Sequence, residues 1–282
     1  MKIVVTGALG HIGSFVIRKL PYQFPGAEII MIDNMMTQRY SSLFNLPSTG
    51  NYKFIEMDIT TQDMRALFDD VQVVIHLAAI TDAAGSFDKV AEVEENNFQS
   101  TVKVADASLE TGARLIALSS TSVYGTQNDI VDEDCSEEEL QPQSPYAKTK
   151  LKEEKLIKEL GNNKGLKAIS CRFGSIFGAS LGMRFHTAVN KFCWQAVTGQ
   201  PLTVWSTAKN QKRPYLALSD AIGAITYFMK KKLYNRETYN VLTDNLTVDA
   251  IIETIGQFIP KIKINHVDSE IMNQLSYEVS NR

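Results

Sequence analysis

Short apolar runs alternate with helix-patterned segments over the first 170 residues of the chain. Runs such as Val73-Val74-Ile75 are apolar at every position, as in strands that helices cover on both faces. This alternation predicts an α/β fold built on a parallel, doubly wound sheet. The predicted strands are Ile3–Thr6, Glu28–Ile32, Tyr52–Met57, Val71–Leu77, Arg114–Leu118 and Leu166–Cys171, and the predicted helices include Val90–Leu109 and Tyr146–Leu160.

The pattern changes after about Arg172, where glycines punctuate a segment that is predicted to be rich in loops. We expect residues 1–173 to form the doubly wound domain, with segments around 213–242 returning to it. Residues 174–282 are expected to form mainly a smaller C-terminal lobe that binds the substrate. The elements predicted within this half are a helix over Thr187–Thr198, a strand over Leu202–Val204 and a helix over Ser219–Met229.

Composition and charge narrow the possible functions. The formal net charge of −3 gives no reason to expect a nucleic-acid partner. The three cysteines form no CxxC pair and the four histidines show no metal-ligand spacing, so neither disulfides nor a metal site is expected. The N-terminal apolar run is too short for a signal sequence, and no later run approaches membrane-spanning length. We therefore expect a cytoplasmic protein without a membrane partner.

A glycine-rich turn follows the first predicted strand and opens a helix. In TGALGHIG, Gly7 permits the tight turn, Gly10 lets the backbone approach a pyrophosphate, and Gly13 lets helix and strand pack closely. Asp33 ends the second strand 20 residues past Gly13, as the dinucleotide-binding fingerprint requires. A carboxylate there accepts hydrogen bonds from the adenosine ribose and repels a 2′-phosphate. The pattern predicts a Rossmann-type domain that binds NAD in preference to NADP.

A tyrosine and a lysine lie one helical turn apart in SPYAKTK. Tyr146 and Lys150 leave the same face of the predicted helix, and an ammonium group beside a tyrosine stabilises its phenolate. Such a tyrosine can take a proton from an alcohol while hydride leaves the same carbon. Taken alone, the pair also fits an ordinary surface contact. Its place about 20 residues after the hydroxyl-rich strand end SSTSVYG, Ser119–Gly125, favours the chemical interpretation.

These motifs together resemble the extended short-chain dehydrogenase/reductase family, in its NAD-dependent nucleotide-sugar epimerase/dehydratase branch. The similarity covers essentially the whole chain, and it implies an NAD-dependent enzyme. The residues that carry it are TGALGHIG, Asp33, Met57-Asp58-Ile59, His76-Leu77-Ala78-Ala79, Asn97, SSTSVYG, YAKTK and Arg213-Pro214-Tyr215 leading to Asp220.

The resemblance implies roles for individual residues. Ser120, five positions before Gly125, would bond the reacting oxygen and share its proton with Tyr146. Lys150 would also hold the nicotinamide ribose, and Tyr124 would pack rather than react. The residues expected at the cofactor are Gly7, Gly10, His11, Ile12, Gly13, Asp33, Asn34, Asp58, Ile59, Leu77, Ala78, Ala79, Thr81, Asn97, Ser119, Tyr146, Lys150 and Phe173.

The two positions after Ser120 discriminate among members of this family. The 4,6-dehydratases resemble one another in carrying an Asp-Glu pair there, because eliminating water needs a second acid and base, and related decarboxylases usually keep the glutamate. Here these positions are Thr121 and Ser122. The resemblance therefore favours a 4-epimerase, in which hydride returns to the same carbon of a keto sugar. A keto-sugar reductase or dehydrogenase stays open, and a non-catalytic dinucleotide-binding regulator is disfavoured by the intact Ser, Tyr and Lys.

A nucleotide-diphosphate sugar, above all a UDP-sugar, is the substrate that the resemblance implies. Arg213 matches the position at which relatives hold the diphosphate, and a guanidinium suits that contact. Ser175 replaces the asparagine of the usual Arg-x-x-Asn pattern, and Arg184 is an alternative source of that contact. The expected substrate-binding residues are Ser120, Thr121, Ser175, Arg184 and Arg213.

Two further expectations concern the helices. Asp220 is expected to cap the helix that follows it. By resemblance, the helices over Val90–Leu109 and Tyr146–Leu160 are those through which relatives pair, so a homodimer is expected.

Overall fold

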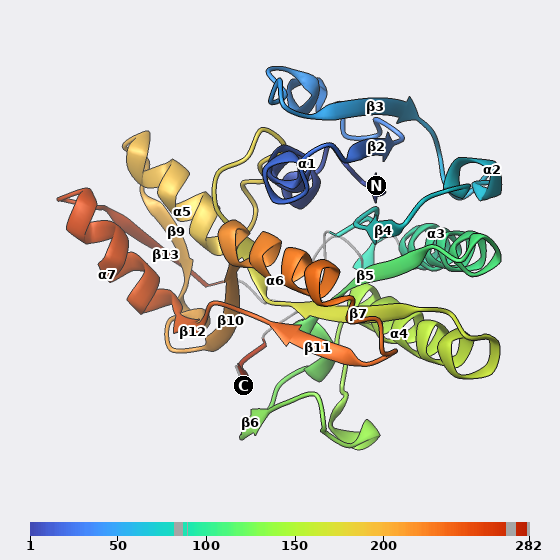
Figure 1. The fold of residues 1–282 in the computed structure, drawn as a ribbon. Coiled ribbons are helices and arrows are strands. Elements are labelled where there is room, and N and C mark those ends of the chain that lie inside the picture. Colours follow the sequence, from blue (N-terminus) through green and yellow to red (C-terminus); the bar gives the residue numbers. More distant parts are fainter. Residues whose placement is uncertain (82–86, 89, 269–274, 281–282) are drawn as a thin grey trace.

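A parallel sheet of seven strands forms the centre of the molecule, in the order β11-β7-β5-β4-β1-β2-β3 (Figure 1). The structure is a computed structural model that describes residues 1–81, 87–88, 90–268 and 275–280. The strand order reverses between β1 and β4, where ligands of such sheets bind at the carboxyl ends of the strands. The strands are β1 (Lys2–Thr6), β2 (Glu28–Asp33), β3 (Asn51–Glu56), β4 (Val73–His76), β5 (Arg114–Ser120), β7 (Ala168–Phe173) and β11 (Thr238–Val241).

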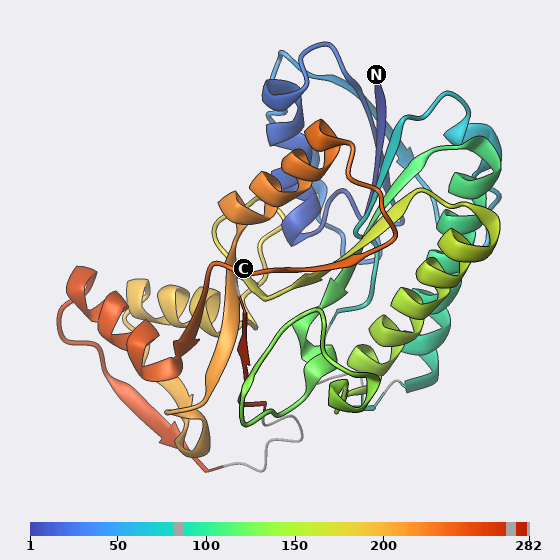
Figure 2. The ribbon, with the colours of Figure 1, turned by 60° about the horizontal axis from the view of Figure 1, so that its bottom comes forward.

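Helices cover both faces of this sheet (Figures 1 and 2). On one face, α1 (His11–Gln23) and α6 (Leu218–Lys231) bury an apolar core against the strands. On the other face, α2 (Arg65–Phe68), α3 (Val90–Thr111) and α4 (Pro145–Lys164) bury a second core. Because both faces are buried, the central strands are apolar throughout, and the predicted doubly wound α/β fold is confirmed.

The second half of the chain adds a smaller layer beside the sheet, with its own apolar core (Figure 2). Its helices are α5 (Ala188–Val197) and α7 (Val248–Phe258). The strands of its two small sheets are β8 (Ser175–Phe177), β10 (Lys212–Ala217) and β12 (Asp244–Thr247) in one and β9 (Leu202–Trp205) and β13 (Ile264–Val267) in the other.

Short elements complete the chain. Strand β6 (Ile130–Val131) pairs in parallel with β14 (Glu278–Val279), which brings the C-terminal segment next to the middle of the sequence. The 3₁₀ turns are η1 (Tyr40–Leu43), η3 (Thr121–Tyr124), η4 (Glu137–Glu139) and η5 (Ser206–Ala208). Within the described ranges, every helix is too short or too polar to cross a membrane.

Two local expectations are corrected. The segment after Arg172, expected to be loop, contains β8, which is stabilised by pairing with β10. Asp220 does not cap its helix: α6 already begins at Leu218, and the Asp220 carboxylate accepts a hydrogen bond from the Thr243 hydroxyl at 2.5 Å. Both errors arise because the partner lies far away in the sequence.

Candidate active site

The glycine-rich turn after β1 packs against the chain that leaves β4. Gly7 has a φ of +64°, and a Cβ on it would lie 2.7 Å from the backbone nitrogen of Ala78. A Cβ on Gly13 would lie 2.2 Å from the carbonyl oxygen of Gly7. Helix α1 begins at His11, and Gly10 at its N-cap supplies no capping side chain. The first N–H groups of α1 are therefore left for a ligand, and such a helix end favours an anion such as a pyrophosphate.

Asp33 is fixed at the end of β2. Its Oδ2 accepts a hydrogen bond from the backbone N–H of Leu9 at 3.0 Å, and its Oδ1 accepts one from Met35 at 3.0 Å. Each carboxylate oxygen keeps a further lone pair. Because Asp33 also lines the cleft, it retains the capacity to accept hydrogen bonds from ribose hydroxyls.

Two buried polar atoms that belong to the cleft have no hydrogen-bond partner among the described residues, Nδ1 of His11 and Oγ of Ser119. The other ring nitrogen of His11, Nε2, donates to the carbonyl of Gly178 at 2.8 Å, which leaves Nδ1 as an acceptor. Burial lowers the pKa of His11, so the ring is neutral. A buried polar atom without a partner costs about 1–3 kcal/mol. Both atoms therefore suit a polar cofactor in the cleft.

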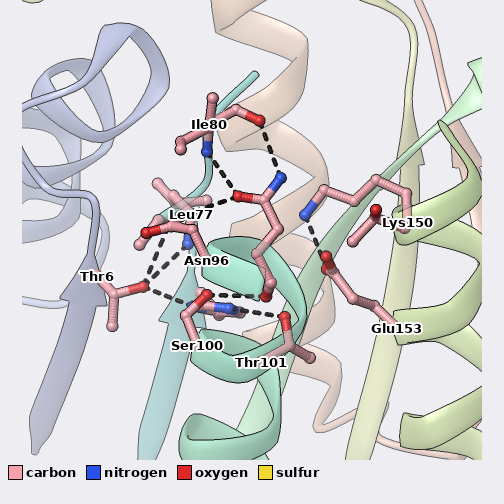
Figure 3. Close-up of polar contacts among 12 residues, drawn as sticks. Thr6, Leu77, Ile80, Asn96, Ser100, Thr101, Lys150 and Glu153 are labelled. Atoms are coloured by element: carbon pink, nitrogen blue, oxygen red, sulfur yellow. Dashed lines mark hydrogen bonds and ion pairs between the residues drawn. The ribbon is translucent and has the colours of Figure 1, made fainter. Parts of the chain in front are cut away.

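A polar network fixes the backbone after β4 (Figure 3). The Thr6 hydroxyl lies 2.8 Å from Nδ1 of His76, whose Nε2 lies 3.1 Å from the Thr101 hydroxyl. The Asn97 side chain accepts from the N–H of Ile80 at 2.7 Å and donates to its carbonyl at 2.9 Å. Asn97 does not line the cleft, so it braces the backbone rather than offering a contact of its own.

The hydroxyl-rich stretch separates into different roles. Ser120 ends β5, and its Oγ accepts from the backbone N–H of Ser122 at 3.2 Å and lies 2.8 Å from the Ser122 hydroxyl. The hydroxyl of Thr121 lies 3.0 Å from that of Tyr277 and donates to the carbonyl of Phe173 at 3.4 Å. Ser120 and Ser122 thus form a hydroxyl pair at the cleft, whereas Thr121 is engaged by its neighbours.

Helix α4 places two polar side chains, Tyr146 and Lys150, in the lining of the cleft. It begins at Pro145, after Ser144 caps it by accepting from the N–H of Ala147 at 3.1 Å. The ammonium of Lys150 lies 5.9 Å from the centre of the Tyr146 ring. It donates to Oε2 of Glu153 at 2.8 Å, as Figure 3 shows.

These charges act on one another. Burial raises the pKa of Tyr146; the Lys150 ammonium lowers it, Glu153 raises it further and Arg184 lowers it. Burial alone would lower the pKa of Lys150, but the negative charge of Glu153, helped by Tyr146, more than compensates, so that pKa is raised. Lys150 is therefore a cation, and its effect on the tyrosine is opposed by its own counter-ion.

The second half of the chain contributes cationic side chains to the cleft. Arg213, on β10, donates from Nε to the carbonyl of Leu275 at 2.9 Å. Arg184 donates to Nε2 of His186 at 2.5 Å, and its charge lies near enough to Tyr146 to lower that tyrosine's pKa. The charge of Arg184 therefore reaches Tyr146 across the cleft.

One cleft of about 540 Å³ joins these parts. Apart from Asn97, every residue predicted to contact cofactor or substrate lines it. Among the described residues no group of His, Cys, Asp and Glu side chains is placed to hold a metal ion.

Several residues of the cleft were not predicted. Arg39 also lines the cleft; burial lowers the pKa of its guanidinium, and the negative charge of Asp33 opposes that shift. A basic residue six positions after Asp33 is the signal that the sequence held. Tyr277 and Trp205 also line the cleft. Tyr277 directly precedes β14, and Trp205 is the last residue of β9. No local pattern marked these two, because only the fold brings them to the site.

Fold and site define an enzyme of the dinucleotide-dependent kind, with a Ser, a Tyr and a Lys gathered in one cleft next to the nucleotide fingerprint. The chain belongs to the NAD-dependent epimerase/dehydratase family, whose model matches residues 3–241. This confirms the resemblance that the motifs indicated, and it confirms NAD as the cofactor of the family.

Individual relatives agree with this assignment. The uncharacterized UDP-glucose epimerase YtcB of Bacillus subtilis is 30% identical over 269 residues, 91% of this chain and 82% of the relative. A trifunctional UDP-glucose 4,6-dehydratase/UDP-4-keto-6-deoxy-D-glucose 3,5-epimerase/UDP-4-keto-L-rhamnose-reductase of Arabidopsis thaliana is 29% identical over 98% of this chain, which spans 43% of that relative's length.

A solved structure extends the comparison to the fold. A point mutant of UDP-glucuronic acid 4-epimerase from Bacillus cereus, crystallised with UDP-4-deoxy-4-fluoro-glucuronic acid and NAD, superposes with a TM-score of 0.91 at 25% identity. The match covers 100% of this chain and 90% of that one.

Proposed function

We propose that this protein is an NAD-dependent nucleotide-sugar 4-epimerase that acts on a UDP-sugar. One observation carries the proposal: Ser120, Tyr146 and Lys150 line the same cleft as the dinucleotide fingerprint, while the two positions after Ser120 hold hydroxyls instead of carboxylates. Such a site has what hydride transfer at an alcohol carbon needs. It lacks the acid–base pair that elimination of water would need next to that serine.

The chain's own residues have distinct tasks in this reaction. Tyr146 takes the proton of the sugar 4-hydroxyl and later returns it to the 4-keto oxygen. Ser120 donates a hydrogen bond to that oxygen, and Lys150 favours the phenolate of Tyr146. NAD supplies the acceptor and donor of hydride when it is bound. Because the same carbon is oxidised and then reduced, inversion requires only that the keto sugar present its other face within the cleft.

In this proposal, the nucleotide half of the substrate binds to the smaller layer. Arg213 is the proposed contact of the diphosphate, since it lines the cleft and its Nε–H is fixed on a carbonyl, which aims the guanidinium. Ser175 and Arg184 line the same region. This division keeps NAD mainly on residues 1–173 and the UDP-sugar mainly on residues 174–282. A UDP-glucose epimerase and a UDP-glucuronic acid 4-epimerase among the similar proteins support a UDP-sugar as substrate.

In the decisive experiment, the purified protein is incubated with NAD and, one at a time, with three UDP-sugars and their 4-epimers. The three are UDP-glucose, UDP-N-acetylglucosamine and UDP-glucuronic acid. Interconversion of one pair without added reductant is the expected result. Consumption of NADH with a keto sugar, without interconversion, would instead assign a reductase. Tyr146→Phe is expected to abolish turnover while NAD still binds, and unchanged turnover in this variant would refute the mechanism.

A homodimer is part of the proposal. α3 and α4 pack side by side, and Lys152 of α4 lies over the ring of Phe98 of α3 at 4.1 Å and pairs with Glu94 at 2.8 Å. A shallow hollow on this surface is lined by Phe98, Leu151 and Leu156 among others. Light scattering on the purified protein is expected to give twice the mass of one chain, and a monomer would contradict this assignment.

A further inference from the structure

Glu153 is a buried carboxylate that the chemistry above does not use. It follows Lys150 by three positions on α4, so Tyr146, Lys150 and Glu153 lie along one face of the helix. The side chains of Lys150 and Glu153 are each 5% exposed, and their charged atoms are 2.8 Å apart. A buried pair of this kind is costly to break, because either partner alone would be an uncompensated charge.

Among the residues that the structure describes, no second anchor for the lysine lies near this pair. Among the described residues, Lys150 makes one contact of hydrogen-bond length, to Oε2 of Glu153, and Oε1 of Glu153 is buried without a hydrogen-bond partner. Thr101 of α3 lies near enough to favour the charged form of the carboxyl. The position of the ammonium next to Tyr146 therefore depends on Glu153.

Other ionisable groups that face the triad come from every element around it. From β4, His76 is neutral, since burial, followed by Lys150, lowers its pKa to about 3. On α4, Glu154 is paired with Arg172 of β7 at 2.7 Å. From the segment after β8, Arg184 acts on Tyr146 from the substrate side. Glu153 is thus the anion in contact with the catalytic lysine.

A purely structural role is the alternative, and the neighbouring residue shows what that looks like. Neither Glu153 nor Glu154 lines the cleft, and Glu154 binds Arg172 of β7, which does not line it either. Lys150, in contrast, lines the cleft and has its ammonium 5.9 Å from the ring of Tyr146. A carboxylate in contact with that ammonium changes the field at the tyrosine, whatever it contributes to stability.

We propose that Glu153 is a positioning residue of the catalytic site, which anchors Lys150 and offsets the positive charge that Lys150 exerts on Tyr146. The inference rests on the proposed role of Tyr146 as the group that exchanges a proton with the sugar. With Lys150 and Glu153 present together, the fixed charge beside the tyrosine is close to zero.

The sign of the effect follows from the charges. Glu153 raises the pKa of Tyr146, so replacing it with a neutral side chain that still holds the Lys150 ammonium in place lowers that pKa and extends the phenolate to lower pH. The two residues are seven positions apart on one helix, about 10 Å along its axis. A unit charge at that distance, at an effective dielectric constant of about 20, moves a pKa by about one unit.

The test titrates Tyr146 directly in the NAD-loaded protein, without any sugar. Tyrosinate absorbance is recorded against pH for the protein and for Tyr146→Phe, and the difference isolates this tyrosine. The same pair of measurements is made in the Glu153→Gln background, where the amide keeps the size and an acceptor for Lys150 but removes the charge. Glu253→Gln, the same change at an exposed position of α7, is the matched control.

We expect the midpoint for Tyr146 to fall by about one pH unit in Glu153→Gln, and the acidic limb of kcat/KM to move with it. Glu253→Gln is expected to change neither. An unchanged midpoint in folded Glu153→Gln would overturn the proposal. If that variant does not fold, Glu153→Asp decides: it keeps the charge, so its midpoint should stay near that of the parent, and a fall of a full unit would overturn the proposal.

The outcome is separable from that of the proposed function. If the protein interconverts no UDP-sugar, the tyrosine titration still reports whether Glu153 acts on Tyr146. If Tyr146→Phe retains turnover, the proposed function fails whatever Glu153 does.

Discussion

Glu154→Gln is expected to destabilise the protein severely, because it breaks the ion pair that ties α4 to the central sheet. Arg172 donates from Nε to both oxygens of Glu154, at 3.0 and 3.2 Å, and from a terminal nitrogen to Oε2 at 2.7 Å. Both side chains are only 6% exposed. The same guanidinium donates to the hydroxyl of Tyr124 at 2.8 Å. The network thus joins β7, α4 and the turn that carries Ser120.

The magnitude follows from burial. An amide in place of the Glu154 carboxylate leaves the Arg172 guanidinium buried without its counter-charge. Breaking such a buried pair costs about 3–5 kcal/mol. For chains of somewhat smaller size, one kcal/mol lowers Tm by about 2–4 °C, so we expect a fall of roughly 6–20 °C. Tyr124 stays protonated, since burial raises its pKa to about 12, so it cannot replace the lost anion.

Urea unfolding and thermal melting measure this loss, with Glu137→Gln as control. Glu137, in η4, pairs at 2.9 Å with Lys155, which lies on α4 next to Glu154. The side chains of Glu137 and Lys155 are 82% and 51% exposed, and such surface pairs contribute at most about 1 kcal/mol. Replacing both buried partners, Glu154→Leu with Arg172→Met, should recover part of the stability. Equal melting temperatures for Glu154→Gln and Glu137→Gln would refute the reasoning.

Three further predictions concern single residues of the site. Asp33→Ala should lower the preference for NAD over NADP by about tenfold or more, because it removes an anion worth about 1.5–3 kcal/mol to ribose hydroxyls; cofactor titrations check this. Arg213→Ala should raise KM for the UDP-sugar by about 10–100-fold while the Kd for NAD stays unchanged, since one charge-assisted contact to the diphosphate is lost; steady-state kinetics and NAD titration separate the two. His76 is neutral in the fold but charges below pH 6.5 when unfolded, so the unfolded state binds more protons, and the free energy of unfolding should fall by about 2 kcal/mol from pH 7 to pH 5. His76→Asn should remove most of that slope in urea unfolding, and a slope equal to the parent's would contradict the assignment.

The sequence predicted the central sheet well, because its strands are covered on both faces and are apolar throughout. The six strands predicted for the first part of the chain all form, with ends that differ by at most two residues. β8 was not predicted, because a strand of three residues is too short to show a periodic pattern. It is stabilised by pairing with β10, which is distant in the sequence. Asp220 was misplaced because its hydrogen bond to Thr243 comes from another segment.

The site was predictable where function resides in local spacing. The glycines, Asp33, Tyr146 and Lys150 all belong to short motifs, and the fold places them in one cleft. The role of Glu153 was not predictable, because two adjacent glutamates follow the lysine in sequence and only packing shows that one contacts Lys150 and the other Arg172. Arg172 lies 18 residues after Glu154, and a contact between segments so far apart has no local signal in the sequence.

In the proposed reaction, Tyr146 and Ser120 serve an oxidation and a reduction at the same sugar carbon. The most direct measurement follows a UDP-sugar that carries deuterium at C4, incubated with the NAD-loaded protein and no other reductant. We expect the 4-epimer to form and to keep its deuterium, because the hydride that leaves C4 returns to it. Loss of the label to solvent, or no 4-epimer with any UDP-sugar offered while Tyr146 is intact, would rule out this reaction.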